Sequence, residues 1–274
     1  MAATLIGTLQ TAYTNFHYLR DVWRRTTEKD ALLGVGMTGI GSGRVQQFDL
    51  EATSKLAVET NKYYAIEIGV NPSARITTVK PSGTTSCVLG TSSGVHAWHN
   101  DYYIRRVRVG KNEAIYTYLT IRHPELVEDD FFKPETQAVI SIPQRAPNDG
   151  ILRHETSLEL LERVKDIYNR WIVPGHQQGN NTHNVSCTVS VREEEWEEVG
   201  KWMWQNREYY NGISVLPYFG GNYKQAPFED IDKETFEGMF IKLKEVDLSN
   251  VVEIIDNTNL TGELACAGVS CEIT

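Results

Sequence analysis

The sequence predicts an α/β protein, because stretches with helical periodicity alternate with short stretches rich in β-branched residues. A helical pattern begins at Ser157 behind a Thr-x-x-Glu sequence, which is typical of a capped helix start. Ala74–Lys80 and Asn184–Val191 are short and β-branched, as strands are. With 274 residues the chain can bury a sizeable core, as one large domain or two modest ones.

The first half is expected to contain two helices, a turn and three strands. Apolar residues at helical spacing predict an amphipathic helix over residues 3–24: Leu5, Ile6, Leu9, Tyr13, Phe16 and Leu19. A glycine-rich turn follows over Gly34–Gly43, and a helix is expected from about Leu50 to Ile68. Strands are expected at Ala74–Lys80, Tyr102–Val109 and Ala138–Pro143.

The second half continues the alternation. Thr156 and Glu159 predict a capping box for a helix over Ser157–Ile172, which ends before Pro174 and Gly175. Next come the strand Asn184–Val191, a helix over Arg192–Arg207 anchored by Trp196, Trp202 and Trp204, and a strand over Gly212–Pro217. The pattern weakens after Leu248, so the sequence predicts a folded part over residues 1–248 and a flexible tail over residues 249–274.

Composition excludes several classes of function. The net charge of −9 argues against binding to a nucleic-acid backbone, which requires a basic surface. No stretch approaches the roughly 18 apolar residues of a membrane span, and the amino terminus does not resemble a signal peptide. Four cysteines are too few for a disulfide scaffold. A reducing, cytoplasmic environment is therefore expected, where a close cysteine pair is typically redox-active or metal-binding.

Gly34, Gly36 and Gly39 match the G-x-G-x-x-G pattern of dinucleotide-binding turns. That pattern should directly follow a hydrophobic strand and begin a helix, and here only Ala31–Leu33 precede it. Glu59, at the spacing of the ribose-binding acid, lies inside a helical pattern. We favour a tight interhelical turn over a nucleotide site.

The segment KPSGTTSCVLG, Lys80–Gly90, follows a predicted strand and leads into a possible helix start. Unpaired backbone N–H groups at a helix start attract anions. Ser82, Thr84 and Thr85 offer hydroxyl donors, and Gly83 lets an oxygen approach the backbone closely. The residues alone allow either an anion site or an ordinary capped turn.

Histidines and cysteines show no metal-ligand spacing, so no metal site is predicted. The candidates considered are His96, His99, His176, His183, Cys87 and Cys187. Cys187 is expected to be a small core residue. Cys87 is expected to be the same, although its place in the anion-like turn leaves a functional role open.

Cys266 and Cys271 lie near the carboxy terminus, and the residues between them are small enough for the chain to fold back and bring the two sulfurs together. A disulfide on a mobile tail would be accessible to thiol exchange. The alternative is a pair of incidental exposed thiols.

Taken together, several stretches resemble the carboxy-terminal part of adenosylcobalamin-dependent (class II) ribonucleotide reductases, especially the monomeric ribonucleoside-triphosphate type. They are, in order, ATLIGTLQTAYTNFHYLR, LLGVGMTGIGSG, TTVKPSGTTSCVLGTSSGVH, YYIRRVRV, PGHQQGNNTHNVSCTVSV, NGISVLPYFGGNYKQAPFEDI and ELACAGVSCEI. Each stretch alone is weak evidence, but the ordered series spans essentially the whole chain and is specific.

The resemblance implies the second half of the ten-stranded α/β barrel of ribonucleotide reductases, followed by a flexible carboxy-terminal tail. Pro81, Ser82, Gly83, Thr84 and Thr85 match the motif that holds substrate phosphates. Cys266 and Cys271 match the dithiol that enters the active site and reduces the disulfide left by each turnover, and thioredoxin or a similar reductant then recharges it. Adenosylcobalamin is the implied cofactor, with His96 as a weak candidate for contacting it.

One departure limits this interpretation. The family's chemistry starts at a thiyl radical on a cysteine in an Asn-x-Cys-x-Glu motif, and that motif does not occur in this sequence. Neither Cys87 nor Cys187 matches that cysteine or the two reducing cysteines of the family. We therefore expect a carboxy-terminal piece, whether a split-gene product, a truncated sequence or a degenerate fragment, that needs an amino-terminal reductase part.

The leading functional hypothesis is thus a segment of a reductase that converts ribonucleotides to 2′-deoxyribonucleotides, contributing phosphate binding and the dithiol shuttle. The alternative is a non-catalytic nucleotide-binding or regulatory module derived from the same fold. A thiol-exchange protein that uses only the tail is a third hypothesis.

Overall fold

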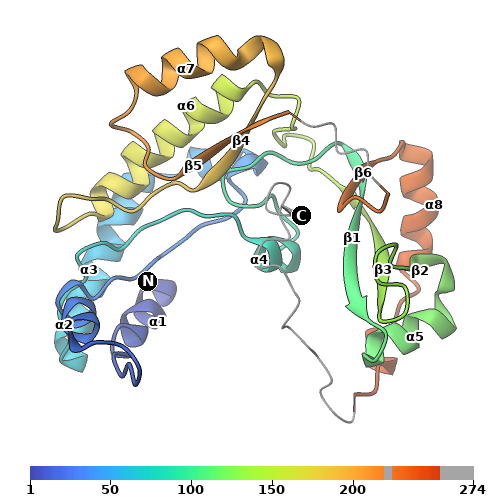
Figure 1. Ribbon diagram of the computed structural model, residues 1–274, viewed down its shortest axis with the longest axis horizontal. Helices are drawn as coiled ribbons and strands as arrows, with labels where there is room; N and C mark the ends of the chain where they lie inside the picture. Colours follow the sequence, from blue (N-terminus) through green and yellow to red (C-terminus); the bar gives the residue numbers. More distant parts are fainter. Residues whose placement is uncertain (219–223, 254–274) are drawn as a thin grey trace. The chain divides into compact units, whose positions relative to one another are not determined.

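The computed structural model describes residues 1–218 and 224–253, which form two compact units (Figure 1). The first unit combines Met1–Ala97 with His154–Tyr218. The second combines Trp98–Arg153 with the described residues after 218. Helices alternate with strands, so the predicted α/β class is confirmed.

The first unit contains six α-helices among its described residues. They are α1 (Ala2–Gln10), α2 (Asp21–Asp30), α3 (Leu50–Ile68), α4 (Gly83–Val88), α6 (Ser157–Ile167) and α7 (Trp196–Gln205). The helical course of α6 continues through a π-helical turn over Tyr168–Ile172. Its start has both hydrogen bonds of the capping box predicted for Thr156 and Glu159.

Parallel extended segments form the sheet of the first unit. Strands β4 (Cys187–Val191) and β5 (Ile213–Pro217) pair in parallel. Val79 bridges in parallel to Val185, just before β4, and Val35 bridges in parallel to Thr77. The order across this sheet is therefore residues 33–35, 75–79, 185–191 and 213–217. The predicted strand at Ala74–Lys80 is extended as expected, although it pairs only through isolated bridges.

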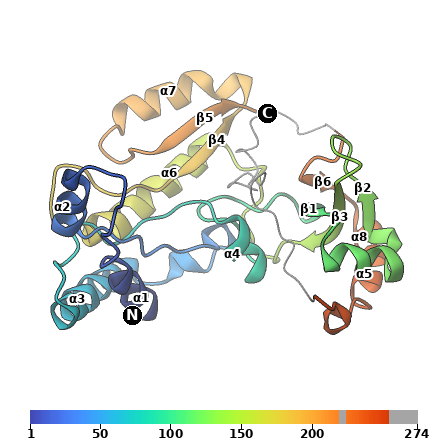
Figure 2. The same ribbon diagram turned by 60° about the horizontal axis from the view of Figure 1, so that its bottom comes forward.

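Helices cover the parallel sheet and bury its apolar side chains. α6 packs against β4 and against α7, and Figures 1 and 2 show both helices running along β4 and β5. Most of the largest fully buried side chains of the core come from the sheet segments and from α6 with its π-helical end: Ile76, Val79, Val185, Val189, Val191, Leu161, Val164, Ile167 and Ile172. Burying this apolar area is the main source of stability for the unit.

The single helix predicted over residues 3–24 is wrong. α1 ends at Gln10 and α2 begins at Asp21. The buried face of α1 carries Thr4 and Thr8, which are 1% and 0% exposed, whereas Ile6 is 59% exposed. The helical spacing of the apolar residues therefore did not identify the face of α1 that packs on α3.

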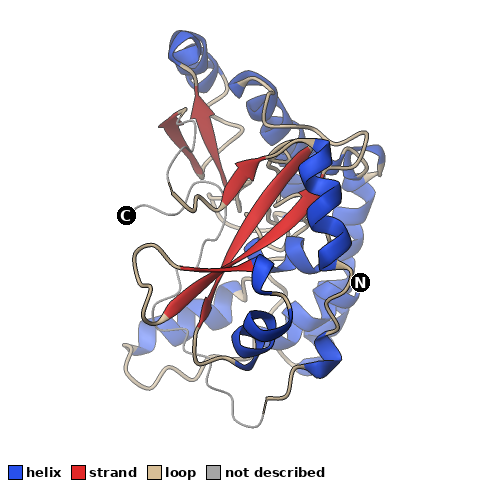
Figure 3. Ribbon diagram, turned by 90° about the vertical axis from the view of Figure 1, so that its right-hand side faces the viewer, coloured by secondary structure: helices blue, strands red, loops and turns tan. Residues whose placement is uncertain are grey.

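The second unit is built on an antiparallel sheet with the order β2-β3-β1-β6. Its strands are β1 (Tyr102–Gly110), β2 (Val127–Asp129), β3 (Gln137–Arg145) and β6 (Phe228–Asp230). Figure 3 shows β1 and β3 as the long central pair, which confirms the two strands predicted here. α8 (Lys233–Leu243) packs against β1 and β3, and α5 (Ala114–Arg122) precedes β2.

Two further outcomes concern the helix after β4 and the carboxy-terminal end. Of the predicted tryptophan anchors, Trp202 is buried, but Trp196 and Trp204 are 41% and 73% exposed and are not anchors. The boundary between the folded part and the tail, placed at residue 248, stays a prediction.

Among the described residues, no helix has the length and apolar character needed to cross a membrane.

Candidate functional site

The segment predicted to bind an anion is a loop that leads into a short helix. Pro81 and Ser82 precede α4, whose first residues are Gly83, Thr84 and Thr85. The side chains of Thr84 and Thr85 are exposed, while Ser86 behind them is buried. The expected helix start is therefore present, with two hydroxyl groups on its outer side.

Every polar group of Ser82 already has a partner inside the chain. Its N–H donates to Ser93 Oγ at 2.9 Å, and its carbonyl oxygen accepts from Ser86 Oγ. Its hydroxyl lies 2.7 Å from Thr38 Oγ1 and does not cap α4. The backbone N–H groups at the start of α4 thus receive no capping bond from this side chain, so they are available to water or to a ligand.

The glycine-rich segment lies directly against this loop. Thr38 bonds Ser82, and the N–H groups of Gly39 and Ile40 donate to Ser92 O and Gly94 O at 2.9 and 3.1 Å. Residues 33–35 run beside residues 75–77 as part of the sheet. The prediction of an interhelical turn for the G-x-G-x-x-G match is therefore wrong for the first residues of that match, which are extended. Neither this extended start nor the 3₁₀ turn that follows at Ile40–Ser42 forms the strand-to-helix turn of a dinucleotide site.

Two glycines permit the close approach of these loops. Gly94 has φ +55°, and a Cβ there would lie 2.7 Å from Lys80 O. A Cβ on Gly41 would collide with the carbonyl oxygen of His96. A larger residue at Gly94 would push the loop after α4 away from Lys80, and one at Gly41 would push the glycine-rich segment away from the same loop.

His96 links the loop after α4 to strand β4. Its Nε2 accepts from the Thr188 N–H at 3.2 Å, and its Nδ1 lies 3.2 Å from Ser93 O. This pattern assigns the proton to Nδ1. Burial, together with the positive charge of Arg163, lowers the pKa of His96 below 6.5. Both ring nitrogens are used within the chain, so the geometry supports a structural role for His96, and its cofactor contact remains an unsupported prediction.

Arg163 is the buried cation behind this region. Its guanidinium bonds both carboxylate oxygens of Glu155 at 2.6 Å, and its Nε donates to Val95 O at 3.1 Å. The side chains of Arg163 and Glu155 are 7% and 11% exposed. This pair is held by bidentate geometry in a low-dielectric setting, and it fixes the segment that carries His96.

The two described cysteines differ in environment. Cys187 is 3% exposed within the core, where burial raises the pKa of its thiol to about 12, so its predicted core position is confirmed. Cys87 is exposed on α4, contrary to its expected core position, and its Sγ bonds Gly83 O. Cys266 and Cys271 lie outside the described residues. Among the residues that are described, no group of three or more His, Cys, Asp or Glu side chains is arranged to hold a metal ion.

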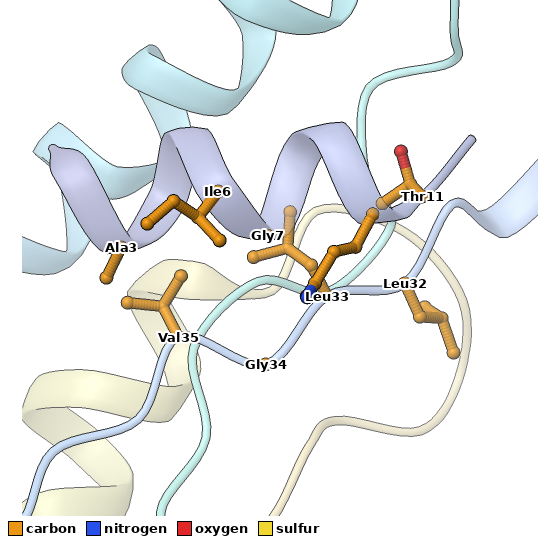
Figure 4. Close-up of a pocket in the computed structure, with 9 residues that line it drawn as sticks. Ala3, Ile6, Gly7, Thr11, Leu32, Leu33, Gly34 and Val35 are labelled. Carbon is orange, nitrogen blue, oxygen red and sulfur yellow. The ribbon is translucent and has the colours of Figure 1, made fainter. Parts of the chain in front are cut away.

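A separate cavity of about 420 Å³ lies between α1 and the outer edge of the parallel sheet (Figure 4). Ala3, Ile6 and Gly7 line it from α1, and Leu32–Val35 line it from the edge segment. Its lining is mostly apolar and contains none of the residues of the anion loop. The cavity is therefore distinct from the predicted phosphate site.

Sequence reasoning missed Thr38, which connects the glycine-rich segment to Ser82. The signal that could have identified it is a hydroxyl residue inside the glycine-rich stretch GVGMTGIGSG.

Comparisons with known proteins place this geometry in a family. No family model matches the chain. An adenosylcobalamin-dependent ribonucleoside-triphosphate reductase from Lactobacillus acidophilus is 28% identical to it, and the match covers 99% of this chain and 40% of the relative. The same-named protein from Lactobacillus leichmannii is 29% identical over 80% of this chain and 29% of the relative. The chain is homologous to part of the cobalamin-dependent ribonucleotide reductases.

A solved structure shows the same fold. The crystal structure of a B-12 dependent (class II) ribonucleotide reductase superposes with a TM-score of 0.73 at 24% identity. The match covers 91% of this chain and 39% of that reductase. The fold expected from the resemblance, part of the reductase α/β barrel, is therefore confirmed. The chain spans less than half of the length of these reductases.

Proposed function

We propose that this chain is the region of an adenosylcobalamin-dependent ribonucleotide reductase that binds substrate phosphates and delivers reducing electrons. Within the complete enzyme it would take part in converting ribonucleotides to 2′-deoxyribonucleotides. One observation carries the proposal: 91% of the chain matches the fold of a B-12 dependent reductase with a TM-score of 0.73.

Phosphate binding is assigned to the start of α4. The backbone N–H groups in the first turn of a helix have no partner within the helix. In α4 these include the N–H groups of Gly83, Thr84 and Thr85, and the side chains of both threonines are exposed beside them. Donors of this kind suit the oxygens of a phosphate group. Pro81 and Ser82 shape the entry into this turn.

Electron delivery is assigned to Cys266 and Cys271. In each cycle their two thiols would reduce the disulfide formed in the active site and become a disulfide themselves, passing on two electrons and two protons. Thioredoxin or a similar dithiol would then reduce the tail disulfide and become oxidised in turn.

Adenosylcobalamin would supply the radical that starts the reaction. His96, the one residue predicted to contact it, does not fit a ligand role, because its ring nitrogens bond Ser93 and Thr188. We therefore assign the cofactor contacts, and the Asn-x-Cys-x-Glu motif, to an amino-terminal part of the enzyme. We also place the enzyme in the cytoplasm, since the tail dithiol requires a reducing environment.

The proposal is tested by the reductant that sustains turnover. In the assembled enzyme, Cys266→Ser or Cys271→Ser should abolish thioredoxin-dependent turnover, whereas turnover with a small dithiol should largely survive because it bypasses the tail. Ser249→Ala, at the start of the tail and distant in sequence from both cysteines, is the control and should change neither rate. Equal loss with both reductants would refute the shuttle role.

A second candidate is a non-catalytic nucleotide-binding module, favoured by the lack of Asn-x-Cys-x-Glu in this sequence. The coding sequence upstream discriminates the two. An adjacent reading frame with that motif supports the enzyme, and an unrelated neighbour supports the module.

A further inference from the structure

The hydroxyl of Thr38 lies at the centre of three hydrogen bonds that join separate loops. Thr38 Oγ1 is 2.9 Å from Ser92 O, 2.9 Å from the N of Gly94 and 2.7 Å from Ser82 Oγ. Thr38 belongs to the glycine-rich segment, Ser82 to the anion loop, and Ser92 and Gly94 to the loop that follows α4. One hydroxyl therefore connects all three loops.

The directions of these bonds follow from counting protons. Thr38 has one hydroxyl proton, and the Ser92 carbonyl oxygen can only accept, so Thr38 donates to Ser92. The Gly94 N–H can only donate, so Thr38 accepts from it. The proton of Thr38 is then used, and the bond with Ser82 requires Ser82 to be the donor.

This direction changes the chemistry that Ser82 can offer. Its hydroxyl proton is directed at Thr38, and its N–H is directed at Ser93 Oγ. Only lone pairs of Ser82 Oγ remain, and these repel the oxygens of a phosphate. Thr84 and Thr85, in contrast, are exposed at the same helix start.

We infer that Thr38 is a positioning residue for the phosphate loop, and that Ser82 acts through Thr38 rather than by donating to phosphate. The inference rests on the proposed phosphate binding. Thr38 holds Ser82 against Gly94, and the entry into α4 is thereby fixed before a ligand arrives. Because the loop is already ordered, less conformational entropy is lost when the ligand binds.

A double-mutant cycle tests this with inorganic tripolyphosphate as the probe, titrated calorimetrically into the full 274-residue chain. Thr38→Val keeps the shape and removes the hydroxyl, and Ser82→Ala removes the other partner. Ser82→Ala should weaken binding by roughly 3- to 10-fold, the effect of one lost hydrogen bond, and Thr38→Val by at least as much, because it also removes the bonds to Ser92 and Gly94. The double variant should bind no more weakly than Thr38→Val alone, since the bond that Ser82→Ala removes is already absent in Thr38→Val.

Conservative and direct-contact variants complete the design. Thr38→Ser keeps the hydroxyl and should restore wild-type affinity, which a purely steric role would not predict. Thr85→Val removes a direct donor, and its effect should multiply with that of Thr38→Val. Hydrogen exchange of amides in α6 verifies that every variant is folded.

Each adverse outcome has a separate meaning. If the losses from Thr38→Val and Ser82→Ala multiply, Ser82 contacts phosphate directly and the inference fails. If Thr85→Val weakens binding but Thr38→Val does not, the phosphate site stands and Thr38 has no positioning role. If the wild-type chain binds no tripolyphosphate, the phosphate site and this inference are both overturned.

Discussion

At the scale of single residues, partly buried polar side chains keep their partners within the chain, and this decides which residues remain for function. His96 and Ser82 were both candidates for ligand contacts, yet each directs its polar atoms at backbone or side-chain partners. Thr84 and Thr85 have the opposite environment, with exposed hydroxyls at a helix start. Residue type alone cannot separate these cases, because the partners come from segments distant in sequence.

The burial of neutral His96 makes stability depend on pH. Its pKa is lowered in the folded chain by burial and by Arg163, so the unfolded chain binds a proton at a higher pH than the folded chain does. Stability is therefore fully present above about pH 7 and falls as the pH is lowered toward 5, by at most about 1.4 kcal/mol per pH unit for one group.

His96→Gln, which keeps an acceptor for the Thr188 N–H, should reduce this loss, measured as the free energy of unfolding in urea at pH 7.5 and 5.5. His183, whose pKa is also lowered by burial, accounts for part of what remains, so His183→Gln is the parallel variant. An unchanged pH dependence in His96→Gln would show that His96 is not the titrating group.

At the scale of elements, the sequence predicts the helices and strands that are determined by the pattern of their own residues. The capping box at Thr156, the alternating residues at β1 and the β-branched residues at β4 are local signals, and the structure has those elements. The prediction for residues 3–24 misjudged the buried face of α1, because Thr8 on that face bonds Asn61, which is 53 residues away in the sequence. The connection of the loops through Thr38 is non-local in the same way, since Thr38 and Ser82 are 44 residues apart.

The network between α1 and α3 should be a large contributor to stability. Asn61 is 0% exposed; its Nδ2 donates to Thr8 Oγ1 and Ser73 Oγ at 3.0 Å each, and its Oδ1 accepts from the Ser73 N–H at 2.8 Å. Asn61→Ala leaves the Ser73 N–H buried without its acceptor. The free energy of unfolding should fall by roughly 2–4 kcal/mol, measured by urea denaturation.

Asn71→Ala is the matched control for that prediction. Asn71 is exposed, and its side chain donates one bond, to Glu28 O at 2.8 Å. Its loss should change stability by less than about 1 kcal/mol, because water replaces the bond. Similar effects of the two substitutions would contradict the importance of the buried network.

At the scale of the whole molecule, the sheet of the first unit has an open outer edge. Residues 33 and 35 direct their backbone groups at residues 75–78, so the N–H and carbonyl of Gly34 point the other way. Within the described residues, no strand pairs with that side of the segment. Leu32 is 43% exposed there, and Ile6 of α1 lies beside the same cavity. An open edge with apolar side chains beside it is a surface that proteins usually cover.

If the chain works with an amino-terminal reductase part, this edge should be covered in the assembly. Leu32→Asp places a charge at the edge and should weaken association with that part by at least roughly 10-fold, since a buried, unpaired carboxylate is strongly unfavourable. Leu56→Asp is the matched control, because Leu56 on α3 is 42% exposed in the isolated chain. Sedimentation of the mixed parts gives both affinities. Equal affinity of Leu32→Asp and wild type for the amino-terminal part would place the contact elsewhere. A loss of affinity in Leu32→Asp but not in Leu56→Asp, with the free energy of unfolding unchanged, would locate the contact at the edge of residues 33–35.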